Sequence, residues 1–286
     1  MSIFASRELA SRIENAECRL LRDAAVAMKD SPNASDMFHA EVGGGFALFT
    51  SPDSPLNKVA GLGFADWQID DTWVALESAF AKRKAAVQVE ISTLAEPAVA
   101  SALSSRGYQL VGFEAILART TGDAEQADAP ALHPDQISLA PCVEGELDLW
   151  IDIVVSGFLV PDTQGVASHE SFEREPLESV IREFAAIDGF QRYIARVDGT
   201  PAGAGSMRVC DGVAQLCGSA TLPEFRRRGV QSSFLAHRLS EARKHGADIV
   251  VVTTQPGSKS MQNVQKKGFE LLYNRAVLIK PPPAHE

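Results

Sequence analysis

An internal repeat is the feature that most constrains how this chain of 286 residues can fold. The segment 107–119 aligns without gaps on 268–280, an offset of 161 residues (268 − 107 = 161). The same offset places the strand-like segment 87–93 on 248–254, and it places a helix-like segment, 71–84, on 232–245. Because one offset relates several successive elements, the sequence predicts two similar units, of which the first is shortened.

The clearest functional motif lies in the second copy, where a strand-like run, 213–222, leads into a helix. Three arginines at 226–228 and then Gly229 separate the run from apolar residues that recur at helical spacing from Val230. The first N–H groups of a helix have no partner within the helix and carry partial positive charge. Gly229 permits a tight turn and a close approach of the backbone to a ligand. We therefore expect the turn to bind an anion, namely a pyrophosphate.

Two common phosphate motifs, G-x-x-x-x-G-K-[ST] and G-x-G-x-x-G after a strand, do not occur in the sequence. The pattern Arg226-x-x-Gly229-x-Gln231 resembles instead the [QR]-x-x-G-x-[GA] signature with which GNAT-superfamily N-acetyltransferases hold the pyrophosphate of acetyl-CoA. Gln231 departs from the signature, which has Gly or Ala there, and we expect a local adjustment around it. The plain alternative is a solvated basic turn at the start of a helix.

A second motif follows in the order that the resemblance requires. After the strand-like run 248–254 come a helix-like segment, 258–267, and the sequence Lys266-Lys267-Gly268-Phe269. In GNAT proteins a short helix ending in K-x-G-F follows the strand that splays from the cofactor strand, and an Asn on it commonly contacts the pantetheine arm. Asn263 matches that Asn. The resemblance covers about 137–280 and implies a mixed α/β (α+β) fold.

The repeat and the resemblance together predict two GNAT-like domains, each a mixed, mainly antiparallel twisted sheet flanked by helices. We expect a degenerate GNAT-like domain at 1–120, a linker at 121–135, a catalytic GNAT domain at 136–280 and a tail at 281–286. The offset maps 226–231 onto 65–70, where Asp66 and Asp70 replace the basic turn. Carboxylates at a helix start favour the helix but repel a phosphate. We expect the first domain not to bind CoA; it serves as a structural lobe or, alternatively, shapes the acceptor pocket.

Composition excludes several classes of protein. The net charge of −10 argues against a nucleic-acid partner, which requires clustered basic residues. No apolar run is long enough to span a membrane, and 1–28 reads as an amphipathic helix and not as a signal peptide. The four cysteines lack metal-type spacing, so we expect buried free thiols, no metal and a cytoplasmic location.

The resemblance also implies which residues carry the chemistry. The expected cofactor-binding residues are Thr221, Leu222, Arg226, Arg227, Arg228, Gly229, Val230, Gln231 and Asn263. Many members of the family use a Tyr as general acid at the position that Val264 occupies here. The remaining candidates are Tyr273 as acid, and Glu224 or His169 as base. Each has a plain alternative, because a Tyr on a strand often only packs and a surface acid or His is common.

Three functions from different classes follow from these observations. The first is an acetyl-CoA-dependent N-acetyltransferase that acetylates a small-molecule amine by direct transfer in a ternary complex, in a pocket built by the helix-like pair 146–158 and 172–187 and the loop 159–169. The acidic balance favours a cationic acceptor. The alternatives are a protein or peptide N-acetyltransferase and a catalytically silent CoA-binding module, which the missing Tyr supports. Family members often pair as homodimers, and the sequence leaves this open.

Overall fold

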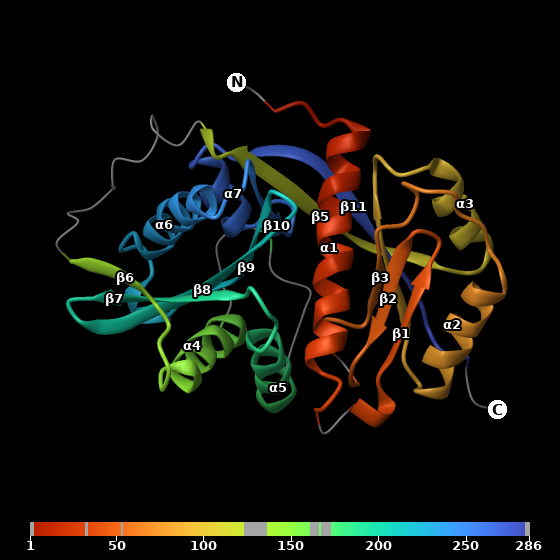
Figure 1. Cartoon of the computed structure of the whole chain (residues 1–286), viewed down its shortest axis with the longest axis horizontal. Helices are drawn as coiled ribbons and strands as arrows, with labels where there is room; N and C mark the ends of the chain where they lie inside the picture. The colour runs from red at the N-terminus through yellow and green to blue at the C-terminus, as the bar shows by residue number, and fades with distance from the viewer. Residues whose placement is uncertain are drawn as a thin grey trace. The chain divides into compact units, whose positions relative to one another are not determined.

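The chain forms two compact units, which Figure 1 shows with their elements. Unit 1 is built from Ala115–Leu272, and unit 2 combines Phe4–Glu114 with Tyr273–Glu286. The computed structural model describes residues 3–31, 34–52, 54–122, 136–160, 166 and 173–283. Each unit therefore takes residues from both copies of the sequence repeat, since 109–114 and 273–280 belong to the same unit.

Unit 1 has a six-stranded sheet in the order β6-β7-β8-β9-β10-β5. Its strands are antiparallel to their neighbours except β9 and β10, which are parallel. The strands are β6 (Ile137–Pro141), β7 (Gln191–Val197), β8 (Thr200–Cys210), β9 (Val213–Thr221), β10 (Ile249–Thr254) and residues 115–120 of β5 (Gln109–Thr120). Its helices are α4 (Leu147–Leu159), α5 (Arg174–Ala185), α6 (Val230–Lys244), α7 (Lys259–Gln265) and the short 3-10 helix η3 (Pro223–Phe225).

The core of unit 1 explains why the basic turn is held firmly. Leu235, Leu239 and Ala242 recur at i, i+4 and i+7 on one face of α6, and all are buried in a core with β-strand residues such as Val250. This spacing puts them on one side of the helix, as the apolar periodicity predicts. Apolar burial of this kind is the main favourable term in folding. The start of α6 is therefore fixed to the sheet by its first buried residue, Val230.

Unit 2 has a five-stranded sheet in the order β1-β2-β3-β4-β11. Its strands are β1 (Phe38–Val42), β2 (Gly45–Phe49), β3 (Lys58–Ala60), β4 (Val87–Ser92) and residues 275–280 of β11 (Glu270–Lys280). Its helices are α1 (Arg7–Ala27), the 3-10 helix η1 (Ala34–Asp36), α2 (Asp71–Lys82) and α3 (Pro97–Ser105). Trp73 and Phe80 of α2 are fully buried in a core that includes Phe49 and Val89 of the sheet.

The predicted repeat is confirmed by the strand directions. In unit 2 the successive pairs β1/β2, β2/β3, β3/β4 and β4/β11 are antiparallel, antiparallel, parallel and antiparallel. In unit 1 the pairs β7/β8, β8/β9, β9/β10 and β10/β5 follow the same series. The last strand of each series is exchanged, because β5 comes from the first copy and β11 from the second. The expected fold class, mixed and mainly antiparallel sheets flanked by helices, is also confirmed.

The cysteines correct one detail of the sequence analysis. All four are free thiols, but only Cys18 is buried, while Cys142, Cys210 and Cys217 are partly exposed. Burial raises the pKa of Cys18 to about 12, so this thiol is unreactive at neutral pH. Within the described part of the chain, no group of three or more His, Cys, Asp or Glu side chains is arranged to hold a metal ion. Of the helices that the structure describes, none is long and apolar enough to cross a membrane.

Candidate cofactor and acyl-transfer site

The turn between β9 and α6 is open at the helix start. Gly229 is the N-cap of α6 with φ +87°, a left-handed conformation that favours glycine, and no side chain caps the helix. Arg227, with φ +63°, is also left-handed, so the chain bends sharply after η3. The first N–H groups of α6 lack partners within the helix, and the helix dipole adds partial positive charge there. This geometry suits an anion.

The arginines of the turn have different surroundings. Arg226 donates from Nε to the Thr221 carbonyl (3.3 Å) and from Nη2 to the Val160 carbonyl, so it fastens the turn to the end of α4. Arg228 lies with its guanidinium 5.5 Å from the Phe225 ring centroid, and Nη2 is 3.7 Å from a carboxylate oxygen of Asp198. Its side chain is 45% exposed. Arg228 is thus placed to meet a ligand from solvent, whereas Arg226 is engaged within the protein.

Gln231 and Asn263 join the two helices of the motif. The Asn263 Nδ2 atom donates a hydrogen bond to Gln231 Oε1, which links the first turn of α6 to α7. The side chain at position 231, where the family signature has Gly or Ala, therefore bonds the residue that was expected to contact the pantetheine arm. The pair fixes the orientation of the Asn263 amide.

Strands β9 and β10 part beside the turn. Their parallel pairing runs from Val213↔Ile249 to Gln215↔Val251, although β9 continues to Thr221 and β10 to Thr254. On its other side β9 carries a bulge, because Gly205 pairs with Ser219 and Ser206 pairs with Cys217. The extra residue is Gly218. Beyond Gln215 the backbone groups of β9 that face β10 have left the ladder, so they are able to bond a ligand.

Arg238 of α6 holds this bulge. Its side chain is 2% exposed, and its guanidinium donates to the Ser206 carbonyl (3.0 Å) and to Ser219 Oγ (3.4 Å). Burial lowers the pKa of Arg238 to about 10. One side chain thus connects the helix that carries the open N-terminus to the strand that borders the opening.

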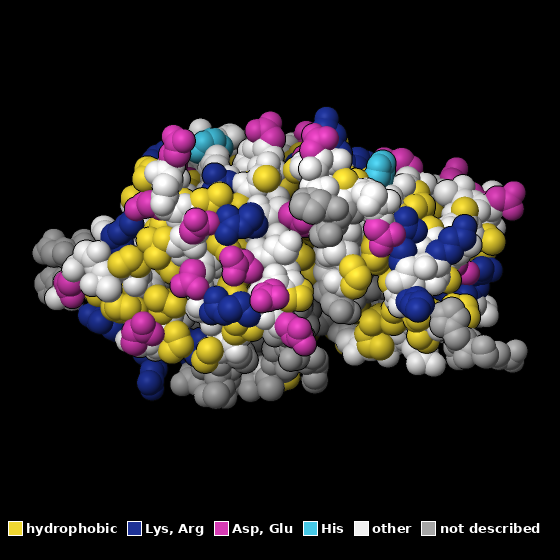
Figure 2. All heavy atoms as spheres, turned by 90° about the horizontal axis from the view of Figure 1, so that it is seen from below, with side chains coloured by type: hydrophobic (Ala, Val, Ile, Leu, Met, Phe, Trp, Pro, Cys, Tyr) yellow, Lys and Arg dark blue, Asp and Glu magenta, His cyan; other side chains and the backbone are white. Residues whose placement is uncertain are grey.

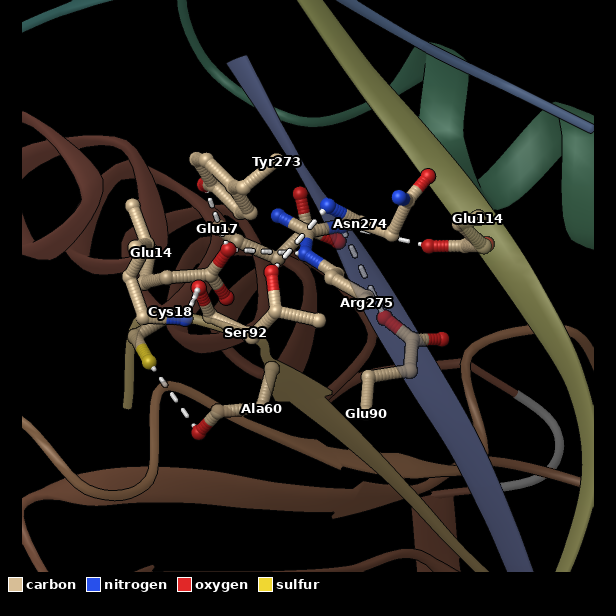
Figure 3. A network of polar contacts seen from close by, with 12 residues as sticks. Glu14, Glu17, Cys18, Ala60, Glu90, Ser92, Glu114, Tyr273, Asn274 and Arg275 are labelled. Carbon is tan, nitrogen blue, oxygen red and sulfur yellow. Dashed lines mark hydrogen bonds and ion pairs between the residues drawn. The ribbon is translucent and has the colours of Figure 1, made fainter. Parts of the chain in front are cut away.

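Two of the three expected acid and base residues, Tyr273 and Glu224, lie within the described part of the chain. Tyr273 is on β11 in the part assigned to unit 2, and its hydroxyl donates to Glu14 Oε1 at 2.7 Å (Figure 3). Burial, followed by the charge of Glu14, raises the pKa of Tyr273 well above its ordinary value. Glu224 lies in η3 with an exposed side chain beside the turn. His169, most of the loop 159–169 and the linker residues 123–135 lie outside the described residues.

The equivalent turn of unit 2 is closed. Asp70 is the N-cap of α2, and its carboxylate accepts a hydrogen bond from the Trp73 N–H at 3.0 Å. The β1–β2 turn covers the segment, since a Cβ at Gly43 would lie 1.8 Å from the Trp67 ring. The helix start that is open in α6 is therefore capped by a carboxylate in α2, in line with the sequence expectation for Asp70.

Unit 2 contains a buried charge cluster that the sequence analysis did not find (Figure 3). Arg275 Nε donates to Glu14 Oε1 at 2.8 Å, and both side chains are almost fully buried. Lys58 lies within 3.0 Å of carboxylate oxygens of Glu17 and Glu90. The sequence placed Glu14 and Glu17 on an amphipathic helix without indicating their burial. A signal was available, because Glu114 and Arg275 are equivalent in the repeat (114 + 161 = 275) and form a 3.4 Å ion pair.

The face of the molecule drawn in Figure 2 is mixed in charge. On the face shown in Figure 2, acidic and basic side chains are interspersed with apolar ones. Such a surface offers no continuous field of one sign on that face.

Comparisons with known proteins place this site in a family context. Residues 159–269 match the model described as the acetyltransferase (GNAT) family. A GCN5-related N-acetyltransferase from Kribbella flavida is similar in structure over 96% of both chains, with a TM-score of 0.65 and 21% identity. A tandem GNAT protein from the clavulanic acid biosynthesis pathway covers 98% of this chain and 95% of its own, with a TM-score of 0.63 and 14% identity. These similarities concern the fold. No curated protein matches the sequence.

Proposed function

Because residues 159–269 match the model of the GNAT acetyltransferase family, we propose that the chain transfers an acetyl group from acetyl-CoA to the amine of a small molecule. The observation that carries this proposal is the uncapped N-terminus of α6, with Gly229 in a left-handed conformation and the exposed Arg228 beside it. This is the arrangement that a pyrophosphate requires, because it combines free N–H donors with positive charge.

The proposed binding mode assigns a role to each part of the site. The N–H groups at 229–231 and the guanidinium of Arg228 hold the pyrophosphate. Arg226 holds the turn in place, and Arg227 and Val230 contribute through their backbone. Asn263, oriented by Gln231, binds the pantetheine arm. The backbone of Thr221 and Leu222, with the end of β9, binds the thioester carbonyl and stabilises charge that develops on its oxygen.

Acetyl-CoA supplies the acetyl group as an activated thioester, and the transfer is direct, in a ternary complex with the amine. The neutral amine attacks the thioester carbonyl, so the carbon–nitrogen bond forms as the carbon–sulfur bond breaks. CoA leaves as a thiolate that takes up a proton, and a base or water accepts the proton that the amine loses. Glu224 is the described candidate for this role, since it is exposed beside the turn. We assign no transfer role to Tyr273, because its hydroxyl is bonded to Glu14.

We further propose that only the second repeat copy binds CoA. The capped start of α2 and the aspartates at 66 and 70 leave no comparable anion site in the first copy. We propose that residues 1–120 and 136–280 are the two copies and that residues 121–135 link them. The free cysteines agree with a reducing, cytoplasmic location.

Titration calorimetry with acetyl-CoA, followed by a thiol-release assay over a panel of amines, tests the proposal. We expect binding, and thiol release with one class of small amine. Binding without release would favour a protein acceptor or a silent CoA-binding module. No binding would contradict the assignment of the turn.

The double substitution Arg228→Glu and Gly229→Asp should abolish acetyl-CoA binding. It places two carboxylates at the helix start, where they repel a pyrophosphate and occupy its N–H donors. The control is Lys244→Glu, which adds negative charge at the opposite end of α6 and should bind acetyl-CoA as the parent protein does. Circular dichroism checks that the fold of both variants is retained. Undiminished affinity of the double variant would show that the cofactor site lies elsewhere.

A further inference from the structure

Thr254, the last residue of β10, carries a buried hydroxyl without a hydrogen-bond partner. Its side chain is 6% exposed, and the Oγ1 atom bonds no protein group. Buried polar groups in folded proteins are almost always paired, with protein, ordered water or a ligand. A buried hydroxyl without a partner costs free energy, so we expect it to bond a group outside the protein.

The position of Thr254 along β10 determines which face of the sheet it shares. Side chains alternate along a strand, so Thr254 lies on the same face as Val250 and Val252. Both valines pack in the core that contains Phe234 of α6 and Val264 of α7. The hydroxyl is therefore on the face that α6 and α7 cover, where Asn263 and Gln231 are joined.

The register places Thr254 beside the opening between the strands. In the β9–β10 ladder each of the three paired residues of β9 lies opposite the residue 36 positions later (249 − 213 = 36). Continued past the end of the pairing, this register brings Thr254 level with Gly218, the bulged residue of β9. Arg238 fixes the bulge through Ser206 and Ser219. The hydroxyl thus lies where β9 and β10 have stopped bonding each other.

We propose that the Thr254 hydroxyl donates a hydrogen bond to an oxygen of the pantetheine arm of the bound acyl-CoA. This inference rests on the proposed function and adds a ligand-binding residue to it. The open start of α6 holds one end of the ligand, and Asn263 of α7 lies along the same face. An arm that passes along this face into the strand opening reaches Thr254 on its way. The bound ligand supplies the partner that the hydroxyl lacks.

Substitution of Thr254 by Val tests the proposal, because Val keeps the shape and removes the hydroxyl. We expect the Kd for acetyl-CoA to rise about 3- to 10-fold, the value of one hydrogen bond. The melting temperature without ligand should stay the same or rise, since an unpaired buried group has been removed. Thr254→Ser should keep the affinity. The matched control is Thr253→Val, which changes the exposed neighbour on the other face of β10.

A truncated ligand locates the contact. ADP carries a pyrophosphate but no pantetheine arm, so its affinity should be equal in Thr254→Val and in the parent protein when measured by displacement of acetyl-CoA. Equal acetyl-CoA affinity of the two proteins would overturn the inference and indicate that water satisfies the hydroxyl. A lower melting temperature of Thr254→Val would overturn it too, because it would reveal a structural partner. Absence of acetyl-CoA binding by the parent protein would refute the proposed function and the inference together.

Discussion

At the scale of residues, Arg226 and Arg228 of the same motif have different partners. They are two positions apart and of the same type, yet Arg226 bonds carbonyl groups of Thr221 and Val160 while Arg228 is exposed beside Phe225. Val160 is the C-cap residue of α4, far earlier in the sequence. The signature therefore indicates a basic turn, but the partner of each guanidinium depends on the fold.

The Tyr273→Phe variant separates packing from catalysis. It removes the hydrogen bond to Glu14, a bond to a buried carboxylate that is worth about 1.5–3 kcal/mol. We expect the free energy of unfolding in urea to fall by about this amount, while the rate of acetyl transfer is unchanged. Tyr108→Phe is the matched control, because it also removes a hydrogen bond from a tyrosine hydroxyl to a carboxylate, here Glu77 at 3.2 Å. A large loss of turnover with unchanged stability would restore Tyr273 as the general acid.

Tyr273 also marks the limit of sequence-based prediction at this scale. The strand, turn and helix at 213–244 could be predicted because their signals are local: apolar periodicity, a glycine at the bend and the basic run. The partner of Tyr273 is Glu14, which is 259 residues away in the sequence. No local pattern carries that information, so the sequence does not indicate that Tyr273 belongs to a buried charge cluster.

At the scale of elements, α2 and α6 show what the two repeat copies share and where they differ. Both follow a strand and bury an aromatic residue at equivalent positions, Trp73 and Phe234 (73 + 161 = 234), in their own core. They differ in the first turn, where Asp70 caps α2, whereas α6 begins two residues earlier in the alignment and Gly229 leaves it open. The caps were predictable from the sequence, because they depend on residues within one turn of the helix.

The charge cluster joins five elements of unit 2, and Glu114 should make its stability depend on pH. Burial, followed by the charge of Glu90, raises the pKa of Glu114 to about 7 from an ordinary value of 4.5. It faces Glu90 of β4, Glu17 of α1, Lys58 of β3 and Arg275 of β11. The folded state then binds its proton more tightly than the unfolded state does. Stability is lost as pH rises from about 4.5 through 7.

The Glu114→Gln variant measures this effect, because it cannot ionise. Between pH 6 and pH 8 the free energy of unfolding of the parent protein should fall by about 1 kcal/mol more than that of the variant. Urea denaturation at the two pH values provides the comparison. Glu96→Gln, a change at an exposed glutamate, should follow the parent protein. A parallel pH dependence of parent and Glu114→Gln would show that Glu114 is already ionised at pH 6.

At the scale of the whole molecule, the exchanged strands tie the two repeat copies to each other. Residues 249–254 of β10 pair with 115–120 of β5, and residues 87–92 of β4 pair with 275–280 of β11. The repeat could be predicted from its constant offset, but the exchange could not. The sequences of β5 and β11 are similar, so their pattern alone does not indicate which sheet each strand joins.

The exchange predicts that neither copy folds when it is made alone. A fragment of residues 136–286 lacks β5, and a fragment of residues 1–122 lacks β11. Each would expose an apolar strand, β10 or β4, whose backbone groups lose an antiparallel partner, and unpaired edges of this kind promote aggregation. We expect both fragments to lack near-ultraviolet circular dichroism and to elute as aggregates in size-exclusion chromatography.

A longer fragment shows whether the strand is the cause. Residues 109–286 restore β5 and contain all the strands of unit 1, so this fragment should fold and bind acetyl-CoA. It differs from 136–286 only by β5 and the segment that follows it. The gain of binding would then follow from six residues, 115–120, that complete the ladder of β10. If the 136–286 fragment folds and binds acetyl-CoA with full affinity, the second copy does not need β5, and the exchange of strands does not support the site.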